Sequence, residues 1–460
     1  MIVKQMIRNL GTAVLLSAWL AGCSKSDFLS QKPDQSLVVP TTLQDFQAIL
    51  DNDNAMNGEL NQGVAPSLGE IATTDYYISD SNYYKQFNEQ EELEYIWAVN
   101  PYPGADIADW DKPYTAILYA NEVITGISGM NVPAAQQTEW NNLMGSAHFY
   151  RAFFFYNLAQ IFSPPYQDSV LDKTYGIPLR MSADINESLH RSTVADTYKQ
   201  IIQDLEQYLS LLPVQASYPT RPCRPAAYAL LARVFMSMRK YDSAYTYAEA
   251  SLGENSTLMD FYTLDSANQT VQRSNPENLF DCLLLRSGPT LFGFVDSSLF
   301  RSYDTANGDL RPKIFYGGNP GYLQKSYDGS FNPYGGIATD EVYLMHAECA
   351  ARNNDTGTAM NDLRTLLSKR YRYHKYISPV VTSVKDVLAL ALSERRKELV
   401  MRGIRWMDLR RLNFEPTFEV TLHRTCEGFP YTLLPNSNRY TYPIPDNVMS
   451  ANPTWIQNPQ

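Results

Sequence analysis

The chain has 460 residues, 44% of them hydrophobic, so it is long enough to bury a large core equivalent to two or three average domains. Acidic residues outnumber basic ones by 49 to 38, which gives a formal net charge of −11 at pH 7. A surface of this sign argues against binding nucleic acid and against charge-driven binding to anionic lipid.

The N-terminus has the pattern of a signal peptide. An apolar run from Leu10 to Leu20 follows a short basic region and is too short to span a bilayer. The Leu-Ala-Gly that precedes Cys23 resembles the bacterial lipobox, in which the cysteine is lipidated after cleavage just before it. We therefore predict a lipoprotein signal peptide over residues 1–22, a lipid on Cys23 and a polar tether over residues 23–42.

Helical periodicity dominates two stretches, about 107–252 and 340–412, and each contains a tetratricopeptide-like pattern. The matching positions are Tyr228, Leu231, Ala232, Phe235, Tyr241, Ala244 and Ala248 in the first, and Tyr343, Ala347, Ala350, Ala359 and Leu363 in the second. A pair over 134–162 and 193–211 matches more weakly. Small residues at these positions let two antiparallel helices approach closely, and stacked pairs form a superhelix.

The segments 51–106 and 253–339 have a different character, with many turn residues and aromatic side chains. Gly-rich turns are expected at 317–321 and 332–336, and short apolar runs in 253–339 predict brief strands. The last segment, 413–460, is Pro-rich and is expected to wrap the scaffold in extended form. We therefore predict a mainly α fold, a tetratricopeptide-like α/α superhelix with an inserted loop-rich lobe that contains short strands.

A densely charged run from Glu394 to Arg411 predicts an amphipathic helix, a break at Gly403 and a second short helix. Glycine is favoured where a helix ends in a left-handed residue. Glu394 and Glu398 lie one helical turn apart, beside several arginines. So many charges around apolar residues indicate an ion-pair network at a packed junction, and not a catalytic centre.

This run, E-R-R-K-E-L-V-M-R-G-I-R-W-M-D-L-R-R, resembles the C-terminal signature of the SusD/RagB family of outer-membrane nutrient-binding lipoproteins. Arg402 stands where that family usually has an acidic or aromatic residue. Other segments that resemble the family are Asp27-Phe28-Leu29, the W-x3-Y-x2-I-x3-N spacing from Trp110, F-Y-R-A-F-F at 149–154 and Y-P-I-P-D at 442–446. The resemblance covers nearly the whole chain and implies that residues 43–460 form one SusD-like domain.

The resemblance also implies a function. The chain would capture a nutrient oligomer, first of all an oligosaccharide, at the outer membrane. It would then deliver that ligand to a SusC-like TonB-dependent transporter, on which it sits as a lid. No cofactor is implied.

Two clusters of aromatic and polar residues form the candidate ligand site. Sugar C–H groups stack on flat aromatic faces, while Asn, Asp and Arg hydrogen-bond to hydroxyl pairs. The candidates are Asp75, Tyr76, Tyr77, Tyr84, Trp97 and Asn100 in the early loops, and Arg286, Phe294, Tyr303 and Tyr316 in the inserted lobe. In the family the ligand sites draw on these two regions, but no individual residue carries over. For any one aromatic, packing between loop and scaffold is the commoner role.

Other functions stay open at this stage. An oligopeptide could replace the sugar, since six Trp residues are a modest number for a glycan binder. A surface hydrolase is disfavoured, because the chain lacks a His-Glu-x-x-His zinc motif, a phosphate-binding Gly-rich loop and a Gly-x-Ser-x-Gly elbow. We expect neither catalytic nor metal-binding residues. A role in assembly without a ligand would leave the early aromatic clusters unexplained.

The cysteines beyond Cys23 are far apart and lack Cys-x-x-Cys spacing. They are Cys223, Cys282, Cys349 and Cys426. We predict small buried residues, although their spacing alone leaves a disulfide open.

Overall fold

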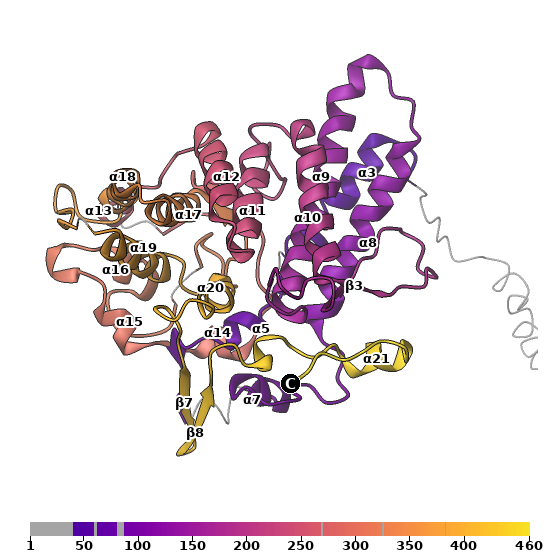
Figure 1. Cartoon of the computed structure of the whole chain (residues 1–460). Coiled ribbons are helices and arrows are strands. Elements are labelled where there is room, and N and C mark those ends of the chain that lie inside the picture. Colours follow the sequence, from indigo (N-terminus) through magenta and orange to yellow (C-terminus); the bar gives the residue numbers. More distant parts are fainter. Residues whose placement is uncertain (1–39, 59–61, 81–86, 268–269, 324–325, 382) are drawn as a thin grey trace, which may run out of the picture. The chain divides into compact units, whose positions relative to one another are not determined.

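Long helices packed side by side form the scaffold of the computed structural model (Figure 1). They are α8 (Ala108–Ser128), α9 (Gln137–Phe162), α10 (Val194–Tyr208), α11 (Arg224–Ser237), α12 (Tyr241–Glu254), α17 (Thr339–Arg352), α18 (Thr356–Ser368), α19 (Val384–Glu398) and α20 (Ile404–Leu412). From α8 to α12 each helix packs against the next, α12 packs against α17, and α17 packs against both α18 and α19. This arrangement confirms the mainly α, tetratricopeptide-like fold predicted from the sequence.

The structure describes residues 40–460 apart from 59–61, 81–86, 268–269, 324–325 and 382. The compact unit is Leu43–Gln460, and Met1–Thr42 form a separate unit. The predicted signal peptide, Cys23 and nearly all of the tether therefore lie outside the described residues. Among the helices that are described, none is both long and apolar enough to cross a membrane.

Buried alanines explain how the helix pairs pack so closely. Helices α11 and α12 pack against each other, and Ala232 of α11 and Ala244 and Ala248 of α12 are all fully buried. Ala347 and Ala359 have the corresponding places in α17 and α18 and are also fully buried. A methyl group is the smallest side chain that still favours helix, so these positions allow close approach without the entropic cost of glycine.

The remaining elements are short and lie mostly in the two predicted loop segments. The early helices are α3 (Leu43–Leu50), α4 (Asp53–Met56), α5 (Leu68–Ile71) and α7 (Glu89–Tyr95), and the inserted ones are α13 (Phe261–Ser266), α14 (Gly288–Phe292), α15 (Ser297–Arg301) and α16 (Arg311–Tyr316). The 3-10 turns are η1 (Ala134–Gln136), η2 (Leu209–Leu211), η3 (Thr305–Asn307) and η4 (Asn438–Tyr440). The inserted lobe therefore contains short helices, whereas the sequence analysis predicted only loops and short strands there. Its helices span only one or two turns, too few for a helical period to show in the sequence.

Within the described residues, the sheets are four antiparallel pairs. They join β1 (Tyr76–Tyr77) to β5 (Phe294–Val295), β2 (Tyr175–Pro178) to β3 (Arg191–Thr193), β4 (Asn278–Phe280) to β6 (Ile337–Ala338), and β7 (Leu422–Cys426) to β8 (Phe429–Leu433). The β4–β6 pair carries Phe280 into the aromatic face of α9. Its ring lies 4.8 Å from that of Phe149 and 5.1 Å from that of Phe153, in edge-to-face geometry. These contacts join the inserted lobe to the scaffold.

The C-terminal segment is more regular than predicted. It forms the β7–β8 hairpin and a final helix, α21 (Asp446–Ala451), instead of running only in extended form. Glu427 and Gly428 form the hairpin turn with φ of 54° and 80°, the left-handed conformation that two-residue hairpins require. Arg424 of β7 points inward, and its guanidinium lies 3.8 Å from the ring centre of Tyr95. The segment thus contributes to the interior.

The charged run forms two helices, as predicted, with one correction. α19 already ends at Glu398, and a turn that includes Met401 at φ 58° separates it from α20. Gly403 is left-handed, with φ 72°, but it is the residue that begins α20 and not the cap of α19. The break therefore needs two left-handed residues, of which the sequence pattern indicated one.

The predicted ion-pair network is confirmed and joins four helices. Arg395 Nε of α19 lies 2.8 Å from Asp408 Oδ2 of α20, and Arg411 Nη2 lies 2.8 Å from Asp408 Oδ1. Arg411 also donates two hydrogen bonds to Glu348 of α17, at 2.5 and 2.7 Å. Glu341 of α17 closes the network, because it accepts from Arg233 of α11 at 2.5 Å and lies 3.7 Å from Arg395.

Every member of this network is buried, so each charge depends on its partners. Burial alone would raise the pKa of Glu348, but the guanidinium of Arg411 outweighs burial and holds that pKa below its usual value. Burial would likewise raise the pKa of Glu341, but the guanidinium groups of Arg233 and Arg395 outweigh burial and lower that pKa. Ion pairs taken out of water stabilise a fold only when every group is paired, and removing one partner leaves an uncompensated charge.

The cysteines of the described region are buried and carry free thiols. They are Cys223, Cys282, Cys349 and Cys426. Burial raises the pKa of the Cys223 thiol to about 11, so this side chain is un-ionised at neutral pH. The prediction of small buried residues is confirmed for these four positions.

Replacing Arg411 with Met should destabilise the protein by roughly 3–5 kcal/mol, because Glu348 and Asp408 each lose a buried partner. Urea denaturation followed by circular dichroism measures the change. Arg364→Met is the matched control, since Arg364 is exposed on α18 and contacts Asn361 at 2.9 Å; it should change stability by less than about 0.5 kcal/mol. Equal stability of the two variants would contradict the structural role of the network.

Candidate functional site

The β1–β5 pair brings the two predicted ligand regions together. Tyr76 pairs with Val295, and Tyr77 pairs with Phe294. Because successive side chains in a strand point to opposite faces, one of these pairs faces the interior and the other faces outward. Tyr76 is only 3% exposed, whereas Tyr77 is 50% exposed. Gly293 allows this packing, since a Cβ there would lie 2.3 Å from the ring of Tyr76.

Three aromatic rings form a stack on the outward face, which we call the aromatic platform: Tyr77, Phe294 and Tyr322. The rings of Tyr77 and Phe294 lie 5.7 Å apart with an interplanar angle of 25°. Tyr322 adds a third ring 4.3 Å from Phe294, tilted by 35°. Its loop is held in place because the N–H of Val295 donates to the carbonyl of Gly321 at 3.0 Å. The ring of Tyr77 is half-exposed, while those of Phe294 and Tyr322 are partly buried against it and against each other.

Charged groups flank the platform. The N–H of Asp296 donates to the carbonyl of Asp75 at 2.8 Å, which continues the β1–β5 ladder beyond the paired residues. Arg396 of α19 reaches Asp75 with Nη2 at 2.6 Å and keeps 30% of its side chain exposed. Asp296 is partly exposed and caps α15 by accepting from Ser298 and Leu299. A partly exposed guanidinium, paired with Asp75, and a partly exposed carboxylate thus lie next to the β1–β5 pair.

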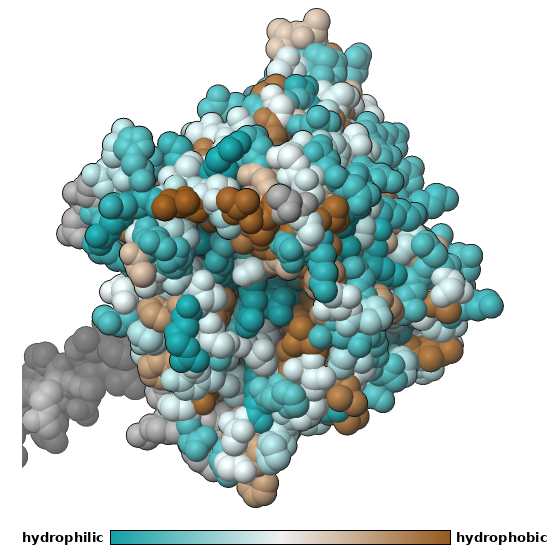
Figure 2. All heavy atoms as spheres, turned by 60° about the vertical axis from the view of Figure 1, so that its left-hand side comes forward, coloured by the Kyte–Doolittle hydropathy of each residue, from teal (hydrophilic) through white to brown (hydrophobic). Residues whose placement is uncertain are grey.

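The surface around this lobe is mainly hydrophilic. Figure 2 brings forward the side of the molecule that bears α13, α15 and α16, where hydrophobic residues gather in a few small groups around a hollow. A surface of this kind offers no broad apolar face for a large partner. A ligand here would meet local aromatic contacts set among polar groups.

A buried carboxylate supports the platform from beneath. Glu70 of α5 accepts from the N–H of Gly403 at 2.8 Å, and its carbonyl accepts from the Tyr76 hydroxyl at 3.3 Å. Burial, followed by the charge of Asp75, raises the pKa of Glu70 from 4.5 to about 7. Glu70 therefore joins the charged run, through its carboxyl at Gly403, to the strand that carries the platform, through its backbone carbonyl at Tyr76.

Five of the ten predicted ligand residues are buried: Asp75, Tyr76, Trp97, Tyr303 and Tyr316. The indole N–H of Trp97 donates to the carbonyl of Ala72 at 3.0 Å, and the Tyr303 hydroxyl donates to that of Lys397 at 2.7 Å. Asp75 is paired with Arg396, as described above. The structure thus gives these side chains packing and anchoring roles instead of a face toward solvent. Their burial favours the packing role that the sequence analysis gave as the commoner one, and contact with a ligand stays a prediction for these five residues.

The other five predicted residues have mixed positions. Tyr77 and Phe294 meet in the platform. Asn100 and Arg286 are exposed, but the described contacts do not join either to the platform. Tyr84 lies outside the described residues. For these residues contact with a ligand stays a prediction.

The sequence reasoning missed Tyr322 and the place of Arg396 beside the rings. A tyrosine directly after the Gly-Asn-Pro-Gly turn was a usable signal, because turns often present side chains to ligands. Metal binding has little support here: in the described part of the chain, no group of three or more His, Cys, Asp or Glu side chains is arranged to hold an ion.

Comparisons with known proteins define the family. One family model, described as "Starch-binding associating with outer membrane", matches residues 27–236, and another, described as "SusD family", matches residues 339–460. A curated relative, SusD-like protein P2 of Formosa agariphila, is 25% identical over 175 residues. That match covers 37% of this chain and about a third (32%) of the relative's length.

Solved structures show the same fold over the whole domain. A SusD superfamily protein of Bacteroides thetaiotaomicron superposes with a TM-score of 0.73 at 22% identity, covering 91% of this chain and all of that one. A putative sugar-binding protein of Bacteroides vulgatus gives 0.71 at 22% identity, covering 92% and 99%. The fold and signature define a helical-repeat protein of the SusD type. The chain belongs to the SusD/RagB family.

Replacing Glu70 with Gln tests the buried carboxyl through the pH dependence of stability. In the folded wild type, the raised pKa favours the protonated form of Glu70. The stability that this preference contributes is present below about pH 4.5 and is lost as the pH rises through about 7. Glu70→Gln stays neutral, so its stability relative to the wild type should increase by roughly 1–3 kcal/mol over this range.

Urea denaturation at several pH values measures this difference. The exposed Glu89→Gln serves as the matched control, and its difference from the wild type should not follow the same curve. A constant difference between Glu70→Gln and wild type from pH 4 to 8 would show that the pKa of Glu70 is the same in the folded and unfolded protein, and so is not raised by burial.

Proposed function

We propose that this protein binds an oligosaccharide on the aromatic platform at the cell surface. The observation that carries the proposal is the cluster of Tyr77, which is 50% exposed, with the partly exposed rings of Phe294 and Tyr322, in the lobe that also holds Arg396 and Asp296. A sugar ring can place its C–H face on the aromatic rings, while its hydroxyls hydrogen-bond to a guanidinium and a carboxylate. The family adds support, since its relatives include one described as a sugar-binding protein.

The position of the platform also supports a ligand site. Its rings come from segments of the chain more than 200 residues apart, and a rigid helical scaffold holds both. Binding residues commonly lie on loops that a scaffold positions in this way. Phe294 and Tyr322 fall between the two matched family segments, in the part of the chain where a ligand preference can differ from one member to another.

We further propose that the protein acts as a binding component without catalysis and delivers its ligand to a SusC-like TonB-dependent transporter. The family description associates related proteins with the outer membrane. A lipid on Cys23 would hold the protein there, because a lipidated residue anchors a chain without a spanning helix. Residues 23–42 would then act as the tether.

The double variant Tyr77→Ala/Phe294→Ala should weaken polysaccharide binding at least tenfold, equivalent to about 1.4 kcal/mol, because two stacking faces are lost. Calorimetric titration with plant, host and microbial polysaccharides measures the loss. Tyr373→Ala is the matched control: Tyr373 is exposed and stacks on Tyr262 at 5.8 Å and 28°, nearly the geometry of the platform pair. Its affinity should stay unchanged.

Three outcomes would change the proposal. Equal affinity of the double variant and the wild type would remove the platform from the site. Saturable binding of an oligopeptide pool, with no response to any glycan, would keep the binding role and replace the ligand. Release of new reducing ends from a polysaccharide by the pure protein would identify a hydrolase.

Replacing Cys23 with Ala should move the protein from the membrane fraction to the soluble fraction, because the lipid attachment site is lost. Labelling with a fatty acid and fractionation of cells measure the change. Cross-linking in intact cells should join the wild type, but not the variant, to a TonB-dependent transporter. A variant that still carries the label would exclude lipidation at this residue, and a wild type without a transporter adduct would count against that partner.

A further inference from the structure

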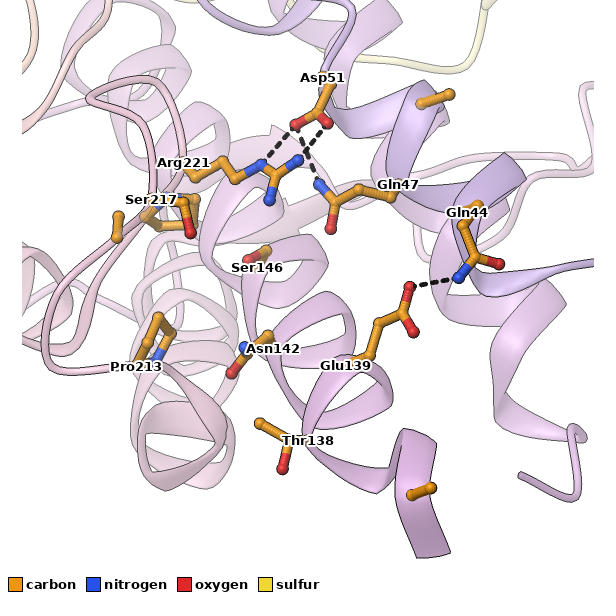
Figure 3. A pocket seen from close by; sticks show the side chains of 14 residues that line it. Gln44, Gln47, Asp51, Thr138, Glu139, Asn142, Ser146, Pro213, Ser217 and Arg221 are labelled. Carbon is orange, nitrogen blue, oxygen red and sulfur yellow. Dashed lines mark hydrogen bonds and ion pairs between the residues drawn. The ribbon is translucent and has the colours of Figure 1, made fainter. Parts of the chain in front are cut away.

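A cavity of about 620 Å³ opens between α3, the start of α9 and the segment 213–222 (Figure 3). This volume lies within the range of small-molecule sites. The cavity shares no residue with the aromatic platform, and it is built from different elements. It is therefore a separate candidate site.

Contacts between elements hold its walls in place. Arg221 donates from Nε to Asp51 Oδ1 at 2.8 Å and from Nη2 to Asp51 Oδ2 at 2.5 Å, which ties segment 213–222 to the end of α3. Gln47 Nε2 donates to the same carboxylate at 3.0 Å. Figure 3 shows these three side chains converging at one end of the cavity. Side chains already held in this way lose little further freedom on binding a ligand.

The other wall comes from α9. Thr138, Asn142 and Ser146 follow one another at four-residue spacing, so they lie along one face of the helix and line the cavity. Beside them Glu139 accepts from Gln44 Nε2 of α3 at 3.0 Å, a second contact between the two helices. The wall thus presents a row of hydroxyl and amide groups.

The charges in the cavity favour a neutral ligand. Asp51 and Arg221 neutralise each other in a two-bond ion pair, which leaves Glu139 as the one further charged residue of the lining. The lining is otherwise made of hydroxyls, amides and small apolar groups. Hydroxyls and amides each both donate and accept hydrogen bonds, as the hydroxyls of a neutral sugar also do.

Apolar surface completes a match to a sugar ring. Ala48, Ala135 and Pro213 line the cavity and can meet the C–H face of a ring. Next to Ser217 of the lining, Tyr218 is 60% exposed, and its ring centre lies 5.2 Å from the guanidinium of Arg221. An exposed aromatic ring beside hydrogen-bonding groups is the same combination that the platform offers.

We propose that this cavity is a second binding site, which takes a short neutral saccharide independently of the platform. The choice of a saccharide rests on the proposed function, whereas the location of the site does not. The cavity is bounded by α3, by the start of α9 and by segment 213–222, and its volume of about 620 Å³ suits a mono- or disaccharide.

Filling the cavity tests the proposal. Asn142→Phe places a ring in the cavity and leaves the contacts of Asp51 and Glu139 intact. Calorimetric titration with cellobiose, maltose, lactose and chitobiose should show binding of at least one by the wild type and at least a tenfold loss in the variant. Gln137→Phe is the matched control, because Gln137 is exposed on the same helix and does not line the cavity; it should bind as the wild type does.

A second variant guards against a folding defect. Ser217→Trp fills the cavity from the exposed segment 213–222 and should cause the same loss. The platform variant Tyr77→Ala/Phe294→Ala should keep disaccharide binding, and Asn142→Phe should keep polysaccharide binding. These crossed readouts separate a failure of this site from a failure of the platform.

Three results would overturn the proposal. The first is the absence of binding of all four disaccharides to the wild type. The second is unchanged affinity in both cavity-filling variants. The third is binding in the cavity of only a charged probe, galacturonate or putrescine, with its loss in Asn142→Phe.

Discussion

Buried charge at the junction of α19 and α20 constrains the whole domain. Arg395, Asp408 and Arg411 are satisfied only when α17 supplies Glu341 and Glu348, and Glu341 in turn requires Arg233 of α11. Hydrophobic contacts tolerate small shifts, but a buried guanidinium that loses its carboxylate leaves a charge that the interior cannot solvate. The four helices are therefore limited to arrangements in which every one of these pairs is made.

The same junction positions the ligand lobe. From α19 the side chain of Arg396 reaches Asp75, the carbonyl of Lys397 accepts from Tyr303, and the N–H of Gly403 donates to Glu70. Strand β1 thus rests on the scaffold through hydrogen bonds and ion pairs on its inner side, and the aromatic platform faces outward. The charged family signature is explained in this way: it fixes the surface from which the platform projects.

Structural features that recur along the sequence could be predicted from it. The direction in which an individual side chain faces could not. Alanines such as Ala232 and Ala248 recur at helical spacing, so the packed helix pairs could be inferred. The charged run contains so many ionic groups among apolar residues that an ion-pair network could also be inferred. The aromatic residues carried no comparable signal. Tyr76 and Tyr77 are adjacent and of the same type, yet one is buried and the other exposed, because a strand of two residues is too short to show alternation. The β7–β8 hairpin could have been inferred from Glu427-Gly428 between alternating residues, but the prolines nearby suggested an extended chain.

The pairing of β1 with β5 has a consequence for the way the protein is made. Glu70 bonds to a residue 333 positions later, and Arg424 bonds to the carbonyl of Ile71 across 353 positions. Contacts of such high sequence separation form slowly, and during synthesis they cannot form until the distant partner has left the ribosome. The support that these two contacts give to the early helices and strand β1 is therefore absent until nearly the entire chain has been made. A chain cut short before Gly403 could assemble the first helix pairs, but it would lack the support under β1 on which its binding surface depends.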